Sequence, residues 1–219
     1  MHRLLFEKKG RAVWISHLDL MRLFQRAFKR GGLHLTHTQG FNPRPSVSIA
    51  LPLSVGVESN CELLDFELEG TSASCEVIQN LLNQALVEGV CVKQVYTGGR
   101  KIKELALLRC SITFIYDSSI PDSACKAIEH LFCRNELLVS KKTKNGIQEQ
   151  NIIPMIDRVH VDVPDANHMV LDAVVCCQNP NLNPMQLAAA VERYLPEIKP
   201  DHVQCCRIEI FDANHEVFR

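Results

Sequence analysis

The order of apolar patterns along the chain is the feature that most restricts its fold. The first half is predicted to hold strand, helix, strand, strand, helix and strand, in that order, because the apolar period changes between two and 3.6 residues. These elements are expected at residues 2–8, 16–30, 46–53, 61–68, 74–87 and 90–96. Residues 12–15 are expected to extend the first strand or to pair with it as a hairpin.

The same order of elements is predicted a second time after residue 106. Its strands and helices are expected at residues 107–116, 121–133, 136–142, 147–153, 170–177, 184–194 and 203–211. Lys144-Asn145-Gly146 carries the Asn-Gly signal of a tight hairpin between two of these strands. Residues 154–168 are harder to assign and leave room for one more strand.

The repeated order predicts an α+β protein made of two tandem ferredoxin-like (βαββαβ) units, each an antiparallel sheet with helices on one face. The 219 residues suit two domains of this size. We place the first domain at residues 1–97 and the second at 107–219. The Gly-rich, basic stretch that opens residues 98–106 is the expected linker.

The helix after the first strand has a clear start and two distinct sides. Ser16 is a good N-cap residue, and Asp19 follows three positions later as in a capping box. The predicted buried stripe is Leu20, Leu23, Phe24, Ala27 and Phe28. The opposite side carries Arg22, Gln25, Arg26, Lys29 and Arg30.

Charge is distributed unevenly, although the formal net charge is only -1. The first fifty residues hold nine Lys or Arg and two acids, a net of +7, so the remaining 169 residues carry -8. Such a separation can attract polyanions to one end of a nearly neutral protein. The alternative interpretation is a basic helix face that is simply solvated.

Residues 37–45 form a Pro- and Gly-rich loop and are the second candidate for a binding site. The side chains suited to stacking, hydrogen bonding and phosphate contact there are His37, Gln39, Phe41, Asn42 and Arg44. The alternative is a rigid turn whose prolines only set the geometry. His17 and Asp19 are the candidate catalytic residues, with His17 as an acid or base, although a structural role in the first helical turn explains both.

Several kinds of active site are excluded by the motifs. The chain has no P-loop, no dinucleotide-binding glycine pattern, no zincin motif and no nucleophile elbow. None of its ten cysteines forms a C-x-x-C pair, and without an export signal they are expected to be reduced thiols. We therefore expect no cofactor and no metal, although Cys176, Cys177, Cys205 and Cys206 leave a metal site open.

The N-terminus has no signal-peptide pattern, and no apolar run reaches the roughly 20 residues of a membrane helix. A cytoplasmic protein without a membrane partner is therefore expected.

Four motifs that occur in order connect the chain to a known family. They are Phe6-Glu7-Lys8-Lys9-Gly10, Ser16-His17-Leu18-Asp19 with its helix, Gln39-Gly40-Phe41-Asn42-Pro43 with Pro45, and Ala50-Leu51-Pro52-Leu53 with Gly56-Val57-Glu58-Ser59. In these residues the chain resembles the radical-SAM-associated (radical-SAM-linked) proteins, a bacterial family of unknown function. The resemblance implies a radical-SAM partner and a role in RNA or ribosome maturation.

Three functions are compatible with these features. The first is an accessory protein that binds transfer or ribosomal RNA, or presents it to the radical-SAM enzyme, through Arg22, Arg26, Lys29, Arg30 and the 37–45 loop. The second is an RNA-processing or RNA-modifying enzyme that uses His17, which we regard as the less favoured since no catalytic motif supports it. The third is a protein-interaction module that docks on the radical-SAM partner without RNA.

Overall fold

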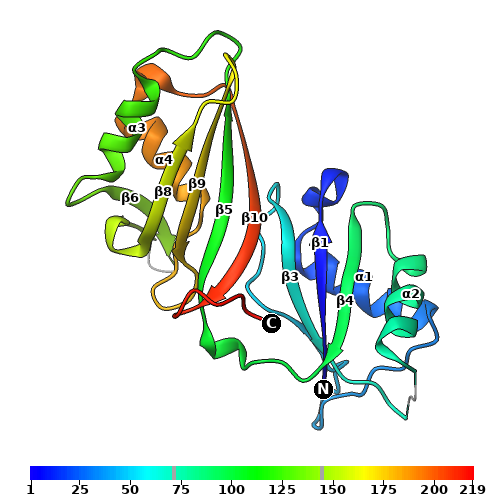
Figure 1. Cartoon of the computed structure of the whole chain (residues 1–219). Coiled ribbons are helices and arrows are strands. Elements are labelled where there is room, and N and C mark those ends of the chain that lie inside the picture. The colour runs from blue at the N-terminus through cyan, green and yellow to red at the C-terminus, as the bar shows by residue number, and fades with distance from the viewer. Residues whose placement is uncertain (71–72, 144–145) are drawn as a thin grey trace. The chain divides into compact units, whose positions relative to one another are not determined.

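The structure is a computed structural model of the chain, and it describes residues 1–70, 73–143 and 146–219. The chain divides into two compact units. Unit 1 comprises Met1–Glu104 together with Phe218–Arg219, and unit 2 comprises Leu105–Val217. Each unit is a layer of helices on a sheet, as the ribbon in Figure 1 shows.

Unit 1 is built on four antiparallel strands in the order β4-β1-β3-β2. Its elements are β1 (His2–Lys8), α1 (His17–Arg30), β2 (Val47–Ile49), β3 (Glu58–Phe66), α2 (Cys75–Ala85) and β4 (Val90–Thr97). The two central strands, β1 and β3, are paired on both sides. Strand β1 lies between β3 and β4, and β3 lies between β1 and β2. All six elements predicted for the first half are therefore present in the expected order.

The core of unit 1 lies between the two helices and one face of this sheet. Phe24 and Phe28 of α1 project onto Phe6 and Phe66 of the strands, with ring centroids 4.8 Å apart in both the Phe6–Phe24 and the Phe28–Phe66 pair. All four rings are buried, and residues of α2 such as Ile78 complete the cluster. Burial of these rings is the main stabilising contribution to the unit. It leaves the polar side of α1 facing away from the sheet.

Residues 10–14 differ from the prediction. The expected extension or hairpin strand is a 3-10 helix, η1 (Gly10–Trp14). It is held by Lys8, whose buried ammonium group donates to the carbonyls of Val13 and Ile15 at 3.1 and 2.8 Å. This tertiary contact overrides the β-branched and aromatic side chains that favour a strand. Strand β2 is also shorter than predicted, because the chain turns at Leu51, which has a φ of 45°.

The outer edge of β4 is covered by side chains of α2. Asn83 accepts from the Val92 N–H at 2.7 Å and donates to the Val92 carbonyl at 2.9 Å, as a neighbouring strand would. Gln79 donates to the carbonyls of Val92 and Lys93. These side-chain amides occupy main-chain hydrogen-bonding groups at the edge of β4 that could otherwise pair with a strand of another chain.

In unit 2, four antiparallel strands pair in the order β10-β5-β9-β8. Its elements are β5 (Leu105–Ile115), α3 (Ala124–Phe132), β6 (Leu138–Thr143), β7 (Gly146–Asn151), β8 (Ile156–Asp162), β9 (His168–Cys176), α4 (Met185–Tyr194) and β10 (His202–Asp212). Short 3-10 helices η2 (Ile102–Glu104), η3 (Ile153–Met155) and η4 (Pro196–Ile198) connect some of them.

The prediction for unit 2 is wrong in one respect. The strands expected at 136–142 and 147–153 do pair, but as a separate two-stranded sheet of β6 and β7. The strand of the main sheet is β8, which lies in the 154–168 stretch. The Asn-Gly turn begins at residues 144–145, outside the described residues. The coarse fold class is confirmed: the chain is a mixed α+β protein with antiparallel strand pairing, and its described residues form four α-helices.

Candidate functional site

The start of α1 is fixed by its own side chains. The hydroxyl of Ser16 accepts from the Asp19 N–H at 3.2 Å and donates to the Asp19 carboxylate at 2.8 Å. Arg22 pairs with the other carboxylate oxygen at 2.9 Å. The bond from Ser16, and then the bond from Arg22, hold the pKa of Asp19 below its usual value. Both carboxylate oxygens of Asp19 are therefore bonded within the first turn of α1, which agrees with a structural role for this residue. His17, two residues earlier, is half-buried.

Three cations of α1 line one side of a hollow of about 640 Å³. Arg22, Arg26 and Lys29 are spaced four and three residues apart, so they lie in one row along the helix. All three are exposed. Within the described part of the chain, Arg26 and Lys29 form no ion pair, and Arg22 pairs only with the exposed Asp19. We call these three residues the cation row.

The rest of the hollow has an apolar floor and a polar far wall. Phe28, Leu33 and Leu35 contribute the floor, and each is buried. The far wall contains His34, His37 and Glu69, with Pro45 beside them. A hollow with an apolar floor and charged rim can take an amphipathic ligand that has a flat apolar part and an anionic part.

The far wall is held by main-chain pairing of three segments. The His34 carbonyl accepts from the Glu69 N–H at 2.8 Å, and Leu35 bridges to Leu68. The Thr36 N–H donates to the Glu67 carbonyl at 2.9 Å, while the Thr36 carbonyl accepts from Ser46 at 2.7 Å. His34 and Glu69 were not among the predicted site residues. The alternation of polar and buried residues at 33–36, directly after the end of α1, was the available signal.

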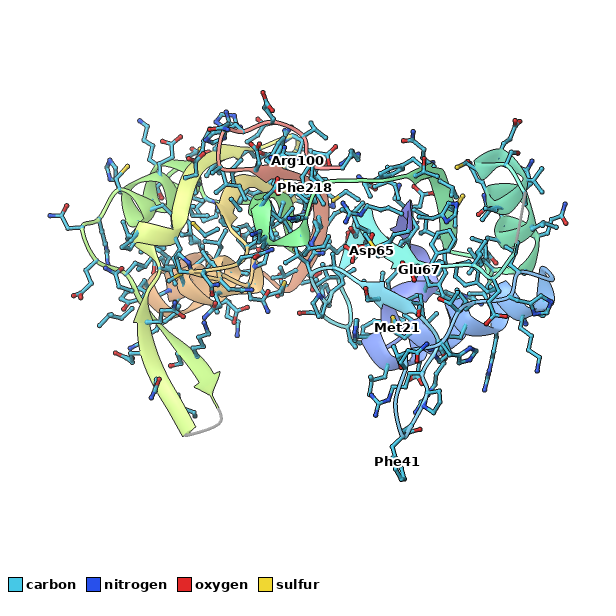
Figure 2. All side chains as sticks on the ribbon, turned by 90° about the horizontal axis from the view of Figure 1, so that it is seen from below. Met21, Phe41, Asp65, Glu67, Arg100 and Phe218 are labelled. Atoms are coloured by element: carbon cyan, nitrogen blue, oxygen red, sulfur yellow. The ribbon has the colours of Figure 1, made fainter. Side chains whose placement is uncertain are left out.

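Residues 36–46, which we call the finger, project from this wall. Its two arms are joined between Thr38 and Arg44, since each N–H of this pair donates to the other residue, at 2.8 and 3.0 Å. Phe41 lies at the tip and is fully exposed, at 111% of its reference area. Figure 2 shows Phe41 pointing away from the body of unit 1. The finger therefore presents an aromatic ring to solvent on a short, closed loop.

The predicted site residues separate into three groups. Arg22, Arg26, Lys29 and His37 line the hollow together. Gln39, Phe41, Asn42 and Arg44 are exposed on the finger beyond it. Arg30 lies elsewhere: its guanidinium donates to the Ala85 carbonyl at 2.6 Å, and it borders a different depression with Leu81.

Only some of the cations that give the first fifty residues their +7 charge lie at the hollow or on the finger. Arg3 and Lys8 are buried, each with its own partners, and Lys9 pairs with Glu7 at 3.2 Å. The expectation that the whole cluster gathers on one exposed surface is therefore too broad. The cation row carries the part of it that faces the hollow.

The two adjacent cysteine pairs lie in strand β10 and at the end of strand β9. Cys177 and Cys205 are buried while their neighbours Cys176 and Cys206 are half-buried, as expected for adjacent strand positions. Burial raises the pKa of Cys177 and of Cys205 to about 12, so both are thiols at neutral pH. Among the described residues, no group of three or more His, Cys, Asp or Glu is placed to hold a metal ion.

No described helix is both long and apolar enough to cross a membrane.

Comparison with solved structures finds chains that match this one over most of its length. A chain of "Crystal Structure of a Cbf5-Nop10-Gar1 Complex" is similar over 95% of this chain and 48% of its own length, with a TM-score of 0.52 and 9% identity. The present chain thus spans about half the length of that protein, and at this identity the likeness shows the fold alone. An unknown protein from Galdieria sulphuraria matches over 94% of this chain and 96% of its own, with 11% identity and a TM-score of 0.27.

Sequence comparison identifies the family. No curated protein matches the chain. A bacterial family without an assigned function was expected from the four motifs, and it is confirmed at that level, because residues 2–184 match a family conserved in bacteria. The chain belongs to the family described as "Uncharacterized protein conserved in bacteria (DUF2344)".

Proposed function

We propose that the chain is an RNA-binding protein whose unit 1 holds a single-stranded segment of transfer or ribosomal RNA. The cation row contacts phosphates, and the finger positions a nucleotide. The resemblance to radical-SAM-linked proteins adds that the chain presents this RNA to a radical-SAM enzyme during RNA maturation. The observation that carries the proposal is the hollow itself, which is lined by the cation row together with His34 and His37.

The physical basis is the chemistry of a nucleotide. Its phosphates are matched by exposed cations, and its base has an apolar face that is stabilised on aromatic and apolar side chains. The cation row offers the first and the exposed Phe41 ring of the finger offers the second, and the hollow's volume of about 640 Å³ is within the range of small-ligand sites. Proteins usually recognise RNA sequence in single-stranded segments, whose bases are unstacked, rather than in duplexes.

Binding of structured transfer and ribosomal RNA fragments at about 50 and 200 mM salt tests the proposal. Phosphate contacts release counterions, so each cation of the row is expected to add about 0.7 to the slope of log affinity against log salt for single strands. The double variant Arg22→Glu/Arg26→Glu should bind more weakly and with a shallower slope than the wild type.

Arg30→Gln is the matched control, because Arg30 belongs to the same helix but donates to Ala85 away from the hollow. It removes one positive charge from α1 and should leave most of the salt slope intact. Binding that is absent, insensitive to salt, or equally weakened by Arg30→Gln and the double variant would contradict the proposal.

We infer further that each unit is ferredoxin-like. The strand orders β4-β1-β3-β2 and β10-β5-β9-β8, each with two helices, support this assignment. In unit 2 the β6–β7 hairpin is then an insertion between α3 and β8.

A contact with a protein partner is the second candidate function, and one observation favours it. Trp14 is 72% exposed and Leu18 is 66% exposed, four residues further along the chain. Large apolar side chains of this exposure are typical of protein interfaces when they lie together. Capture of a radical-SAM protein from nuclease-treated lysate, lost in Trp14→Ala, would support docking, whereas capture that needs intact RNA would support the first proposal.

The enzyme hypothesis has weaker geometric support, because Asp19 is bonded to Ser16 and Arg22 rather than orienting His17. Turnover of RNA by the purified chain, lost in His17→Ala with affinity retained, would revive it.

A further inference from the structure

We infer that the hollow selects guanine, and that Glu69 is the residue that reads the base. This inference rests on the proposed function, since it names the nucleotide that the same site takes. The lining of the hollow contains a carboxylate that a site for anions alone does not need.

Glu69 is an acid in the lining of the same hollow as the three cations. It lines the hollow together with Arg22, Arg26 and Lys29, and it is exposed to the space between the walls. Within the described residues it forms no ion pair with any of the three. A negative charge there lowers the affinity for phosphate by repulsion, so a site for phosphate alone would be better without it.

A carboxylate at this position is suited to hydrogen-bond donors on the ligand. Its two oxygens can accept two parallel N–H bonds, and an ionised acceptor makes such bonds stronger. Guanine presents two adjacent donors on its Watson–Crick edge, the N1–H and the N2 amino group. Adenine and cytosine each offer a single amino group next to an acceptor nitrogen, which a carboxylate repels.

The position of Glu69 is set by the main chain rather than by chance. Its N–H donates to the His34 carbonyl at 2.8 Å, directly after the Leu35–Leu68 bridge. This pairing places Glu69 beside the apolar floor formed by Phe28, Leu33 and Leu35. A nucleotide that enters the hollow can meet Glu69 with its base and the cation row with its phosphate, because both line it.

The test uses three single-stranded RNA probes of about ten nucleotides. The first is oligoadenylate, the second carries one central guanine, and the third carries inosine in place of that guanine, so that only the N2 amino group is missing. The proteins are the full-length wild type, Glu69→Gln and Glu67→Gln. Glu67 is the matched control, because it is an exposed acid two residues from Glu69 that borders a different depression. Asp65 borders the same depression, and Figure 2 labels both residues.

The wild type should bind the guanine probe about tenfold more tightly than oligoadenylate, with inosine between them, as a bidentate contact to one base allows. Glu69→Gln should lose this preference while binding oligoadenylate more tightly, because the repulsion is gone. Glu67→Gln should keep the preference.

The two accounts of Glu69 predict different effects of Glu69→Gln on the preference for the guanine probe. If Glu69 only repels phosphate, Glu69→Gln binds every probe more tightly by the same factor, and the inference is overturned. A wild type that binds with a steep salt slope but without base preference also overturns it and leaves the proposed function standing. Absence of binding to any probe overturns both.

Discussion

Arg3 and Asp65 form a two-pronged ion pair between paired positions of β1 and β3. The guanidinium Nε lies 2.6 Å from one carboxylate oxygen of Asp65, and Nη2 lies 3.0 Å from the other. Arg3 is only 1% exposed, and its third nitrogen donates to the Arg100 carbonyl at 2.9 Å. The hydrogen bond with Asp65 raises the pKa of Arg3 despite its burial. The pair therefore fixes the chain at Arg100, after β4, to the centre of the unit 1 sheet.

Replacing Asp65 by Asn should lower the free energy of unfolding of unit 1 by about 3–5 kcal/mol, because it leaves a buried guanidinium without its counter-charge. Urea unfolding followed by Trp14 fluorescence measures this, since Trp14 is the chain's only tryptophan and belongs to unit 1. Glu104→Gln is the control: it breaks the exposed Arg100–Glu104 pair and should cost at most about 1 kcal/mol. Equal effects of the two variants would contradict the assigned importance of the buried pair.

Phe218 completes the same cluster from the end of the chain. Its ring is fully buried and lies 5.7 Å from the Arg3 guanidinium and 5.4 Å from that of Arg100. Figure 2 shows Arg100 and Phe218 side by side. Phe218→Ala should destabilise unit 1 by about 3–5 kcal/mol through the cavity and the lost cation–π contacts, and Phe218→Leu by less. Unchanged urea midpoints for both variants would show that the C-terminal residues do not stabilise the unit.

His2 should make unit 1 less stable in weak acid. Its ring stacks on Phe66 at 5.3 Å, and burial, followed by repulsion from the terminal amino group, lowers its pKa below the usual 6.5. The unfolded chain then takes up a proton on this residue at a higher pH than the folded chain does, so stability falls as the pH drops below about 6.5. His2→Gln should reduce the difference in unfolding free energy between about pH 7.5 and about pH 5. A pH dependence identical to that of the wild type would contradict this assignment.

The cation row illustrates what the sequence alone could predict. Ser16, the apolar stripe and the end at Gly31 define α1 almost to the residue, because capping and periodicity are local properties. Helical spacing places Arg30 next to Arg26, four residues before it, and only the bond from its guanidinium to the Ala85 carbonyl takes it away from the row. The sequence pattern therefore could not show that Arg30 borders a different depression.

The rest depends on contacts that no local pattern encodes. The wall of the hollow needs Glu69 to pair with His34 across more than thirty residues. The 3-10 helix at residues 10–14 is held by the ammonium of Lys8, which is near in sequence but whose burial the sequence pattern does not reveal. The burial of Arg3 depends on Asp65 in a distant strand, so its charge could not be subtracted from the basic cluster in advance. Strand β8 was hard to recognise because its residues are mostly exposed or half-buried, without clear alternation.

Phe41 should contribute to RNA binding without contributing to the fold. Its ring is fully exposed at the finger tip, so Phe41→Ala should change the free energy of unfolding by no more than about 0.5 kcal/mol. Loss of one base–aromatic stack is worth about 1–3 kcal/mol, so affinity for single-stranded RNA should fall about tenfold. The salt slope should stay the same, because the ring carries no charge. Trp14→Ala removes another exposed aromatic side chain of unit 1 and should leave RNA affinity unchanged. If Trp14→Ala weakens RNA binding as much as Phe41→Ala does, the finger is not the stacking element.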